Sequence, residues 1–536
     1  MLLLAFLQQQ RIANVDESDM MPAQPPRPRI FRWAKFNLEA LLLLAEKLRG
    51  RSCTCDETRV PKSGSLNWVI FITFDDGVKW VFRSPRYDTH MFSDETASKI
   101  LMSEASTLKY LESHCQIPVP KVYSYSGTHE NDIGIPYILQ SKASGRPLSD
   151  YRWTEPIIQP PNIRHPIARL PLSELDHERI MNQLGVIMSR LSKVHFDKIG
   201  SLFKDDTGGF SVGESLSPVL TWQSRDSLET EIERGPFTDE TLYLRSLISA
   251  FTAHAEELPL TPYLFFSPLP KPADYPTWNS FRAATDRRGD FIVVGDKLEG
   301  SRNRLDYCIA GQILEEMVPR LSSDSTGFTI SHHDLHTGNI FVDEDLNITC
   351  IIDWGSATTG PVTELLATPG LAGSSKPPSG ALAAAFQAGF SQESPNISRD
   401  LWERAEMMWC FCRLVRLLSG QDLPLFQRLY DLVYKTEIEY PSDSRDCGWL
   451  FHQRALTTSN KQLLSKLSED DLTDDEVKER EIDVFSGDKM ERLAVARKLT
   501  VMSEMNPRFI GDRRLWRWIE EALKEPVLME QENTRS

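Results

Sequence analysis

The chain has 536 residues, a formal net charge of −16 at pH 7 and 40% hydrophobic residues. This length and apolar content can bury the cores of two or more domains without disulfide support. The acidic balance argues against a nucleic-acid polymer as a partner, because such binding needs dense basic surfaces. The eight scattered cysteines are typical of thiols in a reducing compartment, and the close pair Cys53 and Cys55 lacks the further ligands that a zinc site needs.

The N-terminal sequence predicts neither a signal peptide nor a membrane segment. Residues 1–7 are apolar over too few positions to span a bilayer, and they lack a basic region and a cleavage pattern. Elsewhere charged residues interrupt the longest apolar runs, as in 402–418. We therefore expect a cytoplasmic protein without a membrane partner. A proline-rich stretch at 22–28 makes residues 1–30 a predicted disordered leader.

A small β-rich region is predicted over residues 62–140, after a helical extension at 31–61. Runs rich in β-branched and aromatic residues indicate strands, and apolar residues three or four apart indicate helices. In chain order the predicted elements are a helix at 36–48, strands at 68–74 and 78–82, a helix at 96–113, and strands at 121–125 and 137–140. Asp75-Asp76-Gly77, between the first two strands, is typical of a tight hairpin turn.

The rest of the chain is predicted to be mainly helical, with one large lobe over residues 141–440. Its predicted elements are a helix at 180–194, short strands within 327–342 and at 348–352, and helices at 401–418 and 423–436. Residues 441–536 are expected to form a C-terminal helical extension. The extension includes an acidic segment at 469–483, which we interpret as a solvated helix or linker.

The polar run HHDLHTGN at 332–339 is the strongest chemical signal. It lies between apolar strands, and the strand at 348–352 leads directly into Asp353. An antiparallel hairpin would return Asp353 beside Asn339. Phosphoryl transfer needs a carboxylate that orients the attacking hydroxyl and accepts its proton, and two oxygen ligands that hold Mg²⁺ against the phosphates. Asp334 can supply the first group, and Asn339 and Asp353 can supply the other two.

The histidines of this run admit another interpretation. His332 and His336 are four residues apart, a spacing that suits zinc on a helix. Gly338 and the flanking strands favour a loop instead, in which these histidines support the backbone by hydrogen bonding. A structural alternative also exists for the carboxylates, because a D-x-x-x-x-N spacing occurs by chance and Asp353 alone could cap a strand.

A second pair of charged residues lies in the β-rich region. Alternation along 78–83 places Arg83 on the same strand face as Val81, and helical spacing places Glu104 on the apolar face of its helix. A carboxylate on an apolar face is costly unless it is paired, so we expect an ion pair between Arg83 and Glu104. The alternative is a surface arginine and a glutamate at the edge of the helix.

These motifs resemble those of the protein-kinase-like superfamily, and most closely the H-G-D-L-H-x-x-N and I-D-W motifs of aminoglycoside phosphotransferases, in particular their large fungal branch. The resemblance covers about residues 63–361 and continues loosely to about 440. Further similar segments are SEA at 103–105, IPVPKVY at 117–123, GIPYIL at 134–139 and FDKIGSL at 196–202. The chain departs from the family at His333, usually a glycine, and at Gly355, in many members an acidic residue.

The resemblance implies a bilobal protein-kinase-like fold of the α+β class. It also implies an enzyme that moves the γ-phosphate of ATP, with Mg²⁺, to a hydroxyl of a small molecule. Arg83 and Glu104 take the places of the strand lysine and the helix glutamate that hold the phosphate chain. The segment 138–142 takes the place of the hinge whose main chain binds adenine, which makes Gln140 and Lys142 nucleotide-binding candidates.

Gly64 and Ser65 are further nucleotide-binding candidates. They precede the first strong strand, where a loop that covers the phosphates would lie, and their backbone N–H groups could approach phosphate oxygens. A plain turn is an equally compatible interpretation.

Other functions stay open at this point. A pseudokinase or an interaction protein could keep the fold and lose turnover, and the departures from the family favour it, whereas the retention of Asp334, Asn339 and Asp353 favours an enzyme. A protein kinase is disfavoured because no A-P-E element follows Asp353. The sequence identifies neither the acceptor nor the oligomeric state.

Overall fold

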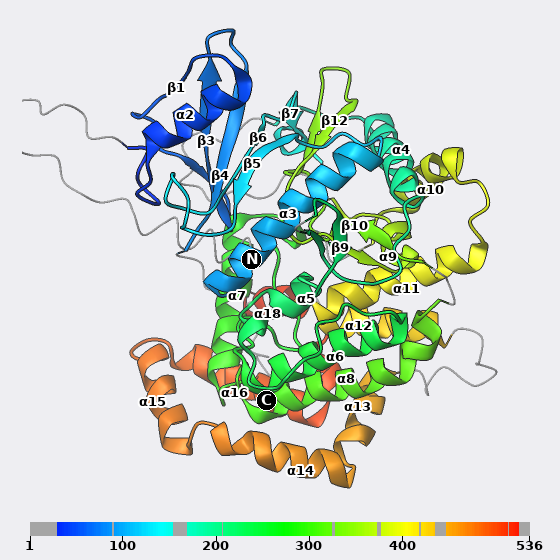
Figure 1. Cartoon of the computed structure of the whole chain (residues 1–536). Coiled ribbons are helices and arrows are strands. Elements are labelled where there is room, and N and C mark those ends of the chain that lie inside the picture. The colour runs from blue at the N-terminus through cyan, green and yellow to red at the C-terminus, as the bar shows by residue number, and fades with distance from the viewer. Residues whose placement is uncertain are drawn as a thin grey trace, which may run out of the picture. The chain divides into compact units, whose positions relative to one another are not determined.

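The computed structural model describes residues 29–87, 91–153, 169–205, 207–323, 327–371, 377–417, 420–434, 446–512 and 514–524. Within them the chain is a mixed α/β protein, with a small antiparallel sheet toward the N-terminus and a mainly helical remainder (Figure 1). The predicted fold class is therefore confirmed. The predicted leader lies outside the described residues except for its last two positions, and no described helix is long and apolar enough to cross a membrane.

The described residues divide into two compact units. The first comprises the described parts of 1–153, 171–250 and 318–409, and the second comprises those of 154–170, 251–317 and 410–536. Residues 251–317 thus group with the C-terminal part of the chain. The lobe limits that we drew from the sequence stay a proposal.

The small sheet belongs to the first unit and has the strand order β1-β3-β4-β6-β5, with β2 also paired to β3. The elements of this region are α2 (Leu38–Arg49), β1 (Cys53–Cys55), β2 (Lys62–Ser63), β3 (Asn67–Phe74), β4 (Lys79–Pro85), α3 (Asp94–His114), β5 (Val122–Ser126) and β6 (Tyr137–Ser141). Every predicted element of this region occurs. β1 and β2 are additional strands, in a polar stretch where the sequence predicted none.

Local signals explain the elements that carry the site. Gly77 has a φ of +82° in the turn between β3 and β4, and Phe74 N donates to Val78 O at 2.9 Å, which closes the predicted hairpin. α3 begins after Ser93, whose hydroxyl accepts a hydrogen bond from Thr96 N at 3.2 Å.

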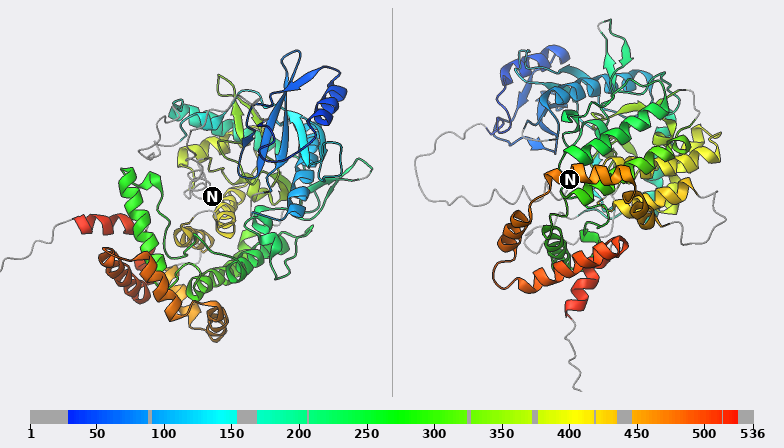
Figure 2. Two further views of the ribbon diagram at one scale, coloured as in Figure 1. Left: turned by 90° about the vertical axis from the view of Figure 1, so that its left-hand side faces the viewer. Right: turned by 90° about the horizontal axis from the view of Figure 1, so that it is seen from below.

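α2 covers one face of the sheet. Trp68 and Phe82, from β3 and β4, cluster with Leu41 of α2, and Ile30 and Cys53 are buried in the same cluster. The extension predicted at 31–61 is therefore part of the core of the sheet. Figure 2 shows α2 beside the sheet from another side.

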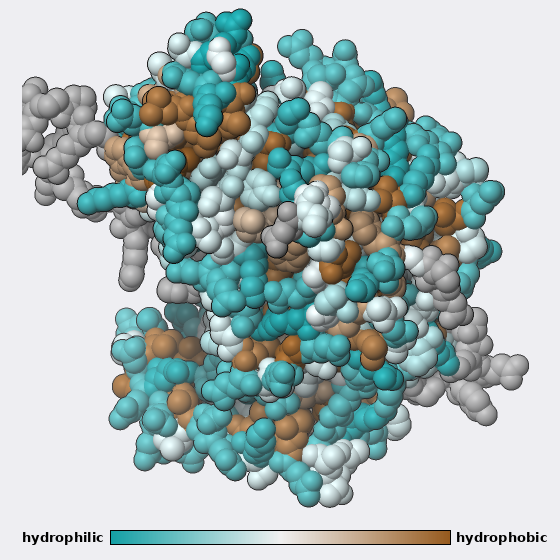
Figure 3. All heavy atoms as spheres, viewed as in Figure 1, coloured by the Kyte–Doolittle hydropathy of each residue, from teal (hydrophilic) through white to brown (hydrophobic). Residues whose placement is uncertain are grey.

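The outer side of α2 is less polar than a solvent-exposed surface usually is. Leu43 and Leu48 are 59% and 46% exposed, and apolar side chains gather over this part of the face in Figure 3. Single exposed leucines are common on soluble proteins.

α3 lies between the small sheet and a larger hydrophobic core. Its buried apolar residues cluster with side chains of the segment 340–354 and of β6, and the members include Leu101, Ala105, Leu108, Ile138, Ile340, Ile351 and Trp354. Glu104 lies on this packed part of α3 and is 2% exposed. The packing of α3 thus fixes the position of a buried carboxylate next to the segment 340–354.

A hairpin formed by β11 (Ile340–Val342) and β12 (Ile348–Ile351) carries the catalytic candidates. Ile340 pairs with Ile351, and Ile352 N donates to Asn339 O at 2.9 Å, so the antiparallel hairpin predicted from the sequence is present. β7 (Arg146–Pro147) pairs with the other edge of β11.

α4 (Glu174–Leu191) holds the turn of this hairpin. The side-chain amide of Gln183 donates to Leu346 O at 3.0 Å and accepts from Ile348 N at 2.8 Å. α4 packs closely on α10 (Gly380–Glu393), where Gly185 and Gly389 lie against the partner backbone. A closely packed helix pair therefore supports the hairpin of β11 and β12.

The remaining elements of the first unit are short. They are β8 (Leu202–Lys204), β9 (Phe210–Val212), α5 (Pro218–Thr221), β10 (Thr329–Ser331), β13 (Thr358–Gly360), α9 (Val362–Leu366) and 3₁₀ turns at Leu148–Asp150 and Arg225–Ser227. Three helices have residues in both units: α6 (Glu240–Glu257), α8 (Ser301–Leu321) and α11 (Arg399–Val415).

The second unit is helical. Its elements are α7 (Trp278–Val293), α12 (Asp422–Val433), α13 (Cys447–Ala455), α14 (Thr458–Leu467), α15 (Asp474–Val484), α16 (Met490–Met505), α17 (Pro507–Ile510), α18 (Leu515–Lys524) and 3₁₀ turns at Pro272–Asp274 and Ser468–Asp470. The acidic segment forms α15, a mostly exposed helix, as expected. Buried Trp516 of α18 donates to Pro268 O at 3.0 Å. The predicted ends at 418 and 435–436 lie outside the described residues.

The close approach of α4 and α10 gives a first prediction. In Gly389→Ala, the added Cβ would lie 1.9 Å from Asn182 O, a backbone atom that cannot move alone. We expect the free energy of unfolding of the first unit to fall by about 2 kcal/mol, measured by urea unfolding. Gly380→Ala, on the same helix but with open space around the new Cβ, is the matched control and should be neutral or slightly stabilising. Equal effects of the two substitutions would contradict the packing argument.

Candidate active site

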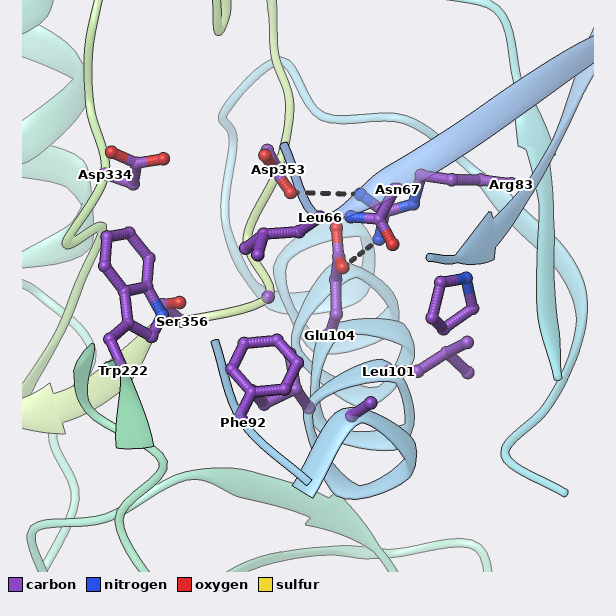
Figure 4. Close-up of a pocket in the computed structure, with 14 residues that line it drawn as sticks. Leu66, Asn67, Arg83, Phe92, Leu101, Glu104, Trp222, Asp334, Asp353 and Ser356 are labelled. Atoms are coloured by element: carbon purple, nitrogen blue, oxygen red, sulfur yellow. Dashed lines mark hydrogen bonds and ion pairs between the residues drawn. The ribbon is translucent and has the colours of Figure 1, made fainter. Parts of the chain in front are cut away.

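A pocket of about 480 Å³, part of it open to solvent, lies within the first unit and includes Arg83, Glu104, Asp334 and Asp353 in its lining (Figure 4). β4 supplies Arg83 and α3 supplies Glu104, whereas the two aspartates come from the segments before β11 and after β12. Figure 4 shows Arg83 bonded to Asp353 and Glu104, with Asp334 across the pocket from them. The fold therefore brings together four residues that the sequence identified separately.

Arg83 bridges two carboxylates. Its Nη2 donates to Glu104 Oε2, and its Nη1 donates to Asp353 Oδ1 at 3.0 Å. Arg83 and Glu104 are 9% and 2% exposed, so both charges are held out of water. Removing one partner of such a pair typically costs about 3–5 kcal/mol. The expected ion pair is present, while its role in holding phosphates stays a prediction.

Burial governs the protonation of this cluster. It raises the pKa of Glu104 to about 7, although the positive charge of Arg83 opposes the shift. Burial alone would lower the pKa of Arg83, but the carboxylates of Glu104 and Asp353 outweigh it and raise that pKa. Arg83 thus stays a cation.

The turn after β12 aims Asp353 at Arg83. Asp353 has a φ of +66°, in the left-handed region that non-glycine residues seldom adopt. Trp354 follows, is fully buried, and donates from Nε1 to Ile351 O at 3.0 Å. A conformation of this kind costs about 1–3 kcal/mol and persists only where the surroundings impose it. The buried indole and the bond to Arg83 supply that constraint.

Gly355, a departure from the family pattern, has a local explanation. A Cβ at this position would lie 3.1 Å from Glu104 Oε2 and 3.2 Å from Ile100 Cγ2. An acidic side chain here would bring another carboxylate against Glu104. The glycine therefore leaves room for the buried ion pair and for the pocket.

The catalytic loop joins Asp334 to Asn339. Asn339 Nδ2 donates to Asp334 O at 2.9 Å, which leaves the amide oxygen as the atom of this side chain that can bind a cation. Asp353 uses Oδ1 for Arg83 and has a second carboxylate oxygen. Carboxylate and amide oxygens are ligands that Mg²⁺ accepts, so the chemistry of the donor set fits this ion.

His332 supports the backbone of this loop, as the sequence suggested. Its Nδ1 accepts from Asp334 N at 3.2 Å, so Nε2 carries the proton and donates to Ile352 O at 2.9 Å. Burial lowers the pKa of His332, which favours the neutral ring. Because both nitrogens serve the backbone, His332 is unsuited to bind zinc. The described residues contain no group of three or more His, Cys, Asp or Glu that could hold a metal.

The other two histidines of the run have different surroundings. His336 Nδ1 accepts from Gly338 N at 2.9 Å, and its Nε2 lies 3.8 Å from Asp334 Oδ2, so this ring flanks the proposed base. His333, the second departure from the family, is not one of the residues that line the pocket. Its Nε2 lies 2.6 Å from Thr358 Oγ1 and 3.8 Å from Glu364 Oε2.

The remaining nucleotide-binding candidates lie outside the pocket lining. Gly64 and Ser65 form the tip between β2 and β3, where Gly64 N donates to Asn67 O at 2.8 Å. Gln140 is buried on β6, and its Oε1 has no hydrogen-bond partner among the described residues. Lys142 is exposed just after that strand. Their roles stay predictions.

Sequence reasoning missed two aromatic residues of the pocket. Phe92 precedes α3. Trp222 follows α5, in a region for which the sequence predicted no element beyond its place in the mainly helical lobe. Each reaches the pocket through contacts between distant parts of the chain. No local motif marks either residue.

The buried carboxylate gives a prediction on pH dependence. The folded chain holds a proton on Glu104 between pH 4.5 and about 7, where an unfolded chain has released it. The wild-type free energy of unfolding should therefore fall relative to that of Glu104→Gln as the pH rises through this window, by about 3 kcal/mol. Urea unfolding of both proteins from pH 4.5 to 8 measures the difference.

The control for this experiment is Glu112→Gln, which changes an exposed glutamate of the same helix. It should show no such trend with pH. A constant difference between the wild type and Glu104→Gln across the window would contradict the assignment of the raised pKa to Glu104.

Comparison with known proteins adds a family match. Residues 271–408 match the sequence profile of the phosphotransferase enzyme family. A subtelomeric hrmA-associated cluster protein of Aspergillus fumigatus is 28% identical over 192 residues, which cover 34% of this chain and 33% of that protein. Altered inheritance of mitochondria protein 9, mitochondrial, of Candida albicans is 29% identical over 182 residues, 32% of this chain and 26% of that protein. The chain thus spans a third or less of these relatives.

Among solved structures, the macrolide 2′-phosphotransferase MphH from Brachybacterium faecium is similar over 81% of this chain and 100% of its own, with 13% identity and a TM-score of 0.35. The profile match includes Asp334, Asn339 and Asp353 but excludes Arg83 and Glu104, which lie before it. Residues 271–408, which hold these three residues, are thus similar to the phosphotransferase enzyme family, the kind of family that the motifs predicted.

Proposed function

We propose that the chain is an ATP-dependent phosphotransferase that moves the γ-phosphate to a hydroxyl of a small molecule. In this proposal residues 62–140 and 141–440 form the two lobes that enclose the nucleotide. The observation that carries it is the joint position of Arg83, Asp334 and Asp353 in one pocket, with Asn339 bonded to the backbone of Asp334.

Each residue has a defined part in the transfer. Asp353 and Asn339 would hold Mg²⁺, which neutralises charge on the phosphates when bound. Arg83, fixed by Glu104, directs its guanidinium toward the phosphate chain, where a planar fork can bind two oxygens. Asp334 orients the acceptor hydroxyl and receives its proton. The γ-phosphorus gains a bond to the acceptor oxygen and loses its bond to the bridging oxygen, which leaves on ADP.

The cation of Arg83 suits a site of this kind. Two carboxylates hold the guanidinium, so little conformational entropy remains to be lost when phosphate binds. His332 and His336 support the loop on either side of Asp334. Gly64, Ser65, Gln140 and Lys142 would contact the nucleotide at the hairpin tip and at the hinge.

The second candidate is a pseudokinase that binds a partner and does not turn over. The arginine in place of the usual lysine favours it. Neither other departure from the family obstructs the site, however, because His333 is not part of the pocket lining and Gly355 leaves space beside Glu104. These observations support the enzyme over the pseudokinase.

The proposed base gives the next prediction. Asp334→Asn keeps the shape of the side chain and removes its basicity, so kcat should fall roughly 10²- to 10⁴-fold. The affinity for the Mg²⁺–nucleotide complex should stay close to that of the wild type, because Asp353 and Asn339 are intact. Magnesium-dependent ADP formation with a panel of metabolite alcohols measures the first quantity, and calorimetry with a non-hydrolysable ATP analogue measures the second.

The matched control is Asp345→Asn, an exposed aspartate in the turn between β11 and β12. It should leave both quantities unchanged. Undiminished turnover in Asp334→Asn would refute the role of Asp334, and nucleotide binding without any turnover in the wild type would favour the pseudokinase.

A further inference from the structure

The pocket lining has a charged part and an apolar part. Arg83, Glu104, Asp334 and Asp353 form the charged part. The apolar part of the lining consists of Leu66, Pro85, Phe92, Ala97, Ile100, Leu101 and Trp222. Asp334 and Trp222 lie on the same side of the pocket in Figure 4, while Phe92 lies below Glu104. Trp222 therefore places part of the apolar lining on the side of the pocket that holds Asp334, the carboxylate that would receive the hydroxyl proton.

Phe92 and Trp222, the two aromatic residues of the pocket, lie on segments that are far apart in the sequence and hydrogen-bonded to each other. The connecting bonds run from Ser224 N to Met91 O at 2.9 Å and from Ser93 N to Asp226 Oδ2 at 2.8 Å. They hold the segment that carries Phe92 against the segment that carries Trp222. The next two residues after Trp222 have φ values of +59° and +63°, both in the left-handed region. Trp222 thus sits on a sharply constrained turn.

Trp222 also contributes a polar atom. The residue is 7% exposed, and its Nε1–H is buried with no hydrogen-bond partner among the described residues. Buried indole N–H groups normally find an acceptor, because an unsatisfied donor costs about 1–3 kcal/mol. An oxygen atom of a molecule bound in the pocket would satisfy this donor.

The charges of the pocket do not favour a polycationic acceptor. Of its three carboxylates, those of Glu104 and Asp353 already bind Arg83. An amino sugar with several ammonium groups needs several carboxylates to replace its hydration. The aromatic and aliphatic lining suits an apolar body instead.

We infer that the acceptor is an uncharged alcohol with an aromatic or aliphatic body and a second oxygen that accepts a hydrogen bond from Trp222 Nε1. This inference rests on the proposed phosphotransferase function. The hydroxyl oxygen bonds to the γ-phosphorus, the bond from phosphorus to the bridging oxygen breaks with its electron pair going to ADP, and the proton goes to Asp334. The products are a phosphate monoester and ADP.

A pair of nearly isosteric probes tests the role of the indole N–H. 4-Methoxyphenethyl alcohol and 4-ethylphenethyl alcohol differ in one ether oxygen, and phenylalaninol adds an ammonium group to a similar body. With Mg²⁺ and ATP, we expect kcat/KM for the methoxy compound to exceed that for the ethyl compound roughly tenfold, and phenylalaninol to be the poorest acceptor. In Trp222→Phe, which keeps an aromatic ring and removes the N–H, the ratio should fall toward one.

A binding measurement separates this inference from the proposed function. Calorimetry with a non-hydrolysable ATP analogue and Mg²⁺ should show binding of both uncharged probes to the wild type. Trp449→Phe, an exposed tryptophan of the second unit, is the control and should keep the wild-type ratio. Preference for phenylalaninol, an unchanged ratio in Trp222→Phe, or no binding of the uncharged alcohols would overturn the inference. Phosphorylation of other alcohols would leave the proposed function standing. A wild type that binds the probes without consuming ATP would refute the proposed function, and with it the acceptor role of the alcohol.

Discussion

The buried guanidinium of Arg83, held between Glu104 and Asp353, is the interaction on which the site depends. Arg83 comes from the small sheet, Glu104 from α3, and Asp353 from the turn after β12. Arg83 and Glu104 are buried, and neither of their charges is stable in an apolar environment without a partner, whereas Asp353 is partly exposed. The cluster therefore links three parts of the first unit and fixes how β4, α3 and the catalytic segment meet.

Packing around this cluster fixes the turn at Asp353 and the hairpin of β11 and β12 in one arrangement. The apolar residues of α3 share a core with Trp354, and Trp354 anchors the strained turn at Asp353. On the other side of the hairpin, Gln183 of α4 bonds both ends of the turn between β11 and β12. Shifting the register of β11 and β12 by one residue would move the side chains to opposite faces and separate Asn339 from Asp353.

Much of this arrangement follows from local sequence patterns. The small sheet was predicted from the turn sequence before Val78, the apolar spacing of α3 and the order of the strands. The hairpin was predicted from the spacing between HHDLHTGN and Asp353. Glu104 could be singled out because a carboxylate on an apolar helix face needs a partner. The bond between Arg83 and Asp353 was not predicted, because it joins residues 270 apart in the sequence.

Other features could not be found from one sequence. β1 and β2 lie in a polar stretch, and only pairing with β3 makes them strands. Ile30 was assigned to a leader because prolines precede it, yet it is buried in the core of the sheet. Trp222 and Phe92 meet the pocket through tertiary contacts alone. The grouping of 251–317 with the C-terminal helices likewise depends on long-range contacts.

A crystal structure with a non-hydrolysable ATP analogue and Mn²⁺ in place of Mg²⁺ tests the central claim most directly. The account predicts an anomalous-scattering peak bonded, at about 2 Å, to a carboxylate oxygen of Asp353 and the amide oxygen of Asn339, with Arg83 turned toward the phosphates. A nucleotide bound elsewhere, or a metal that contacts neither Asp353 nor Asn339, would contradict it.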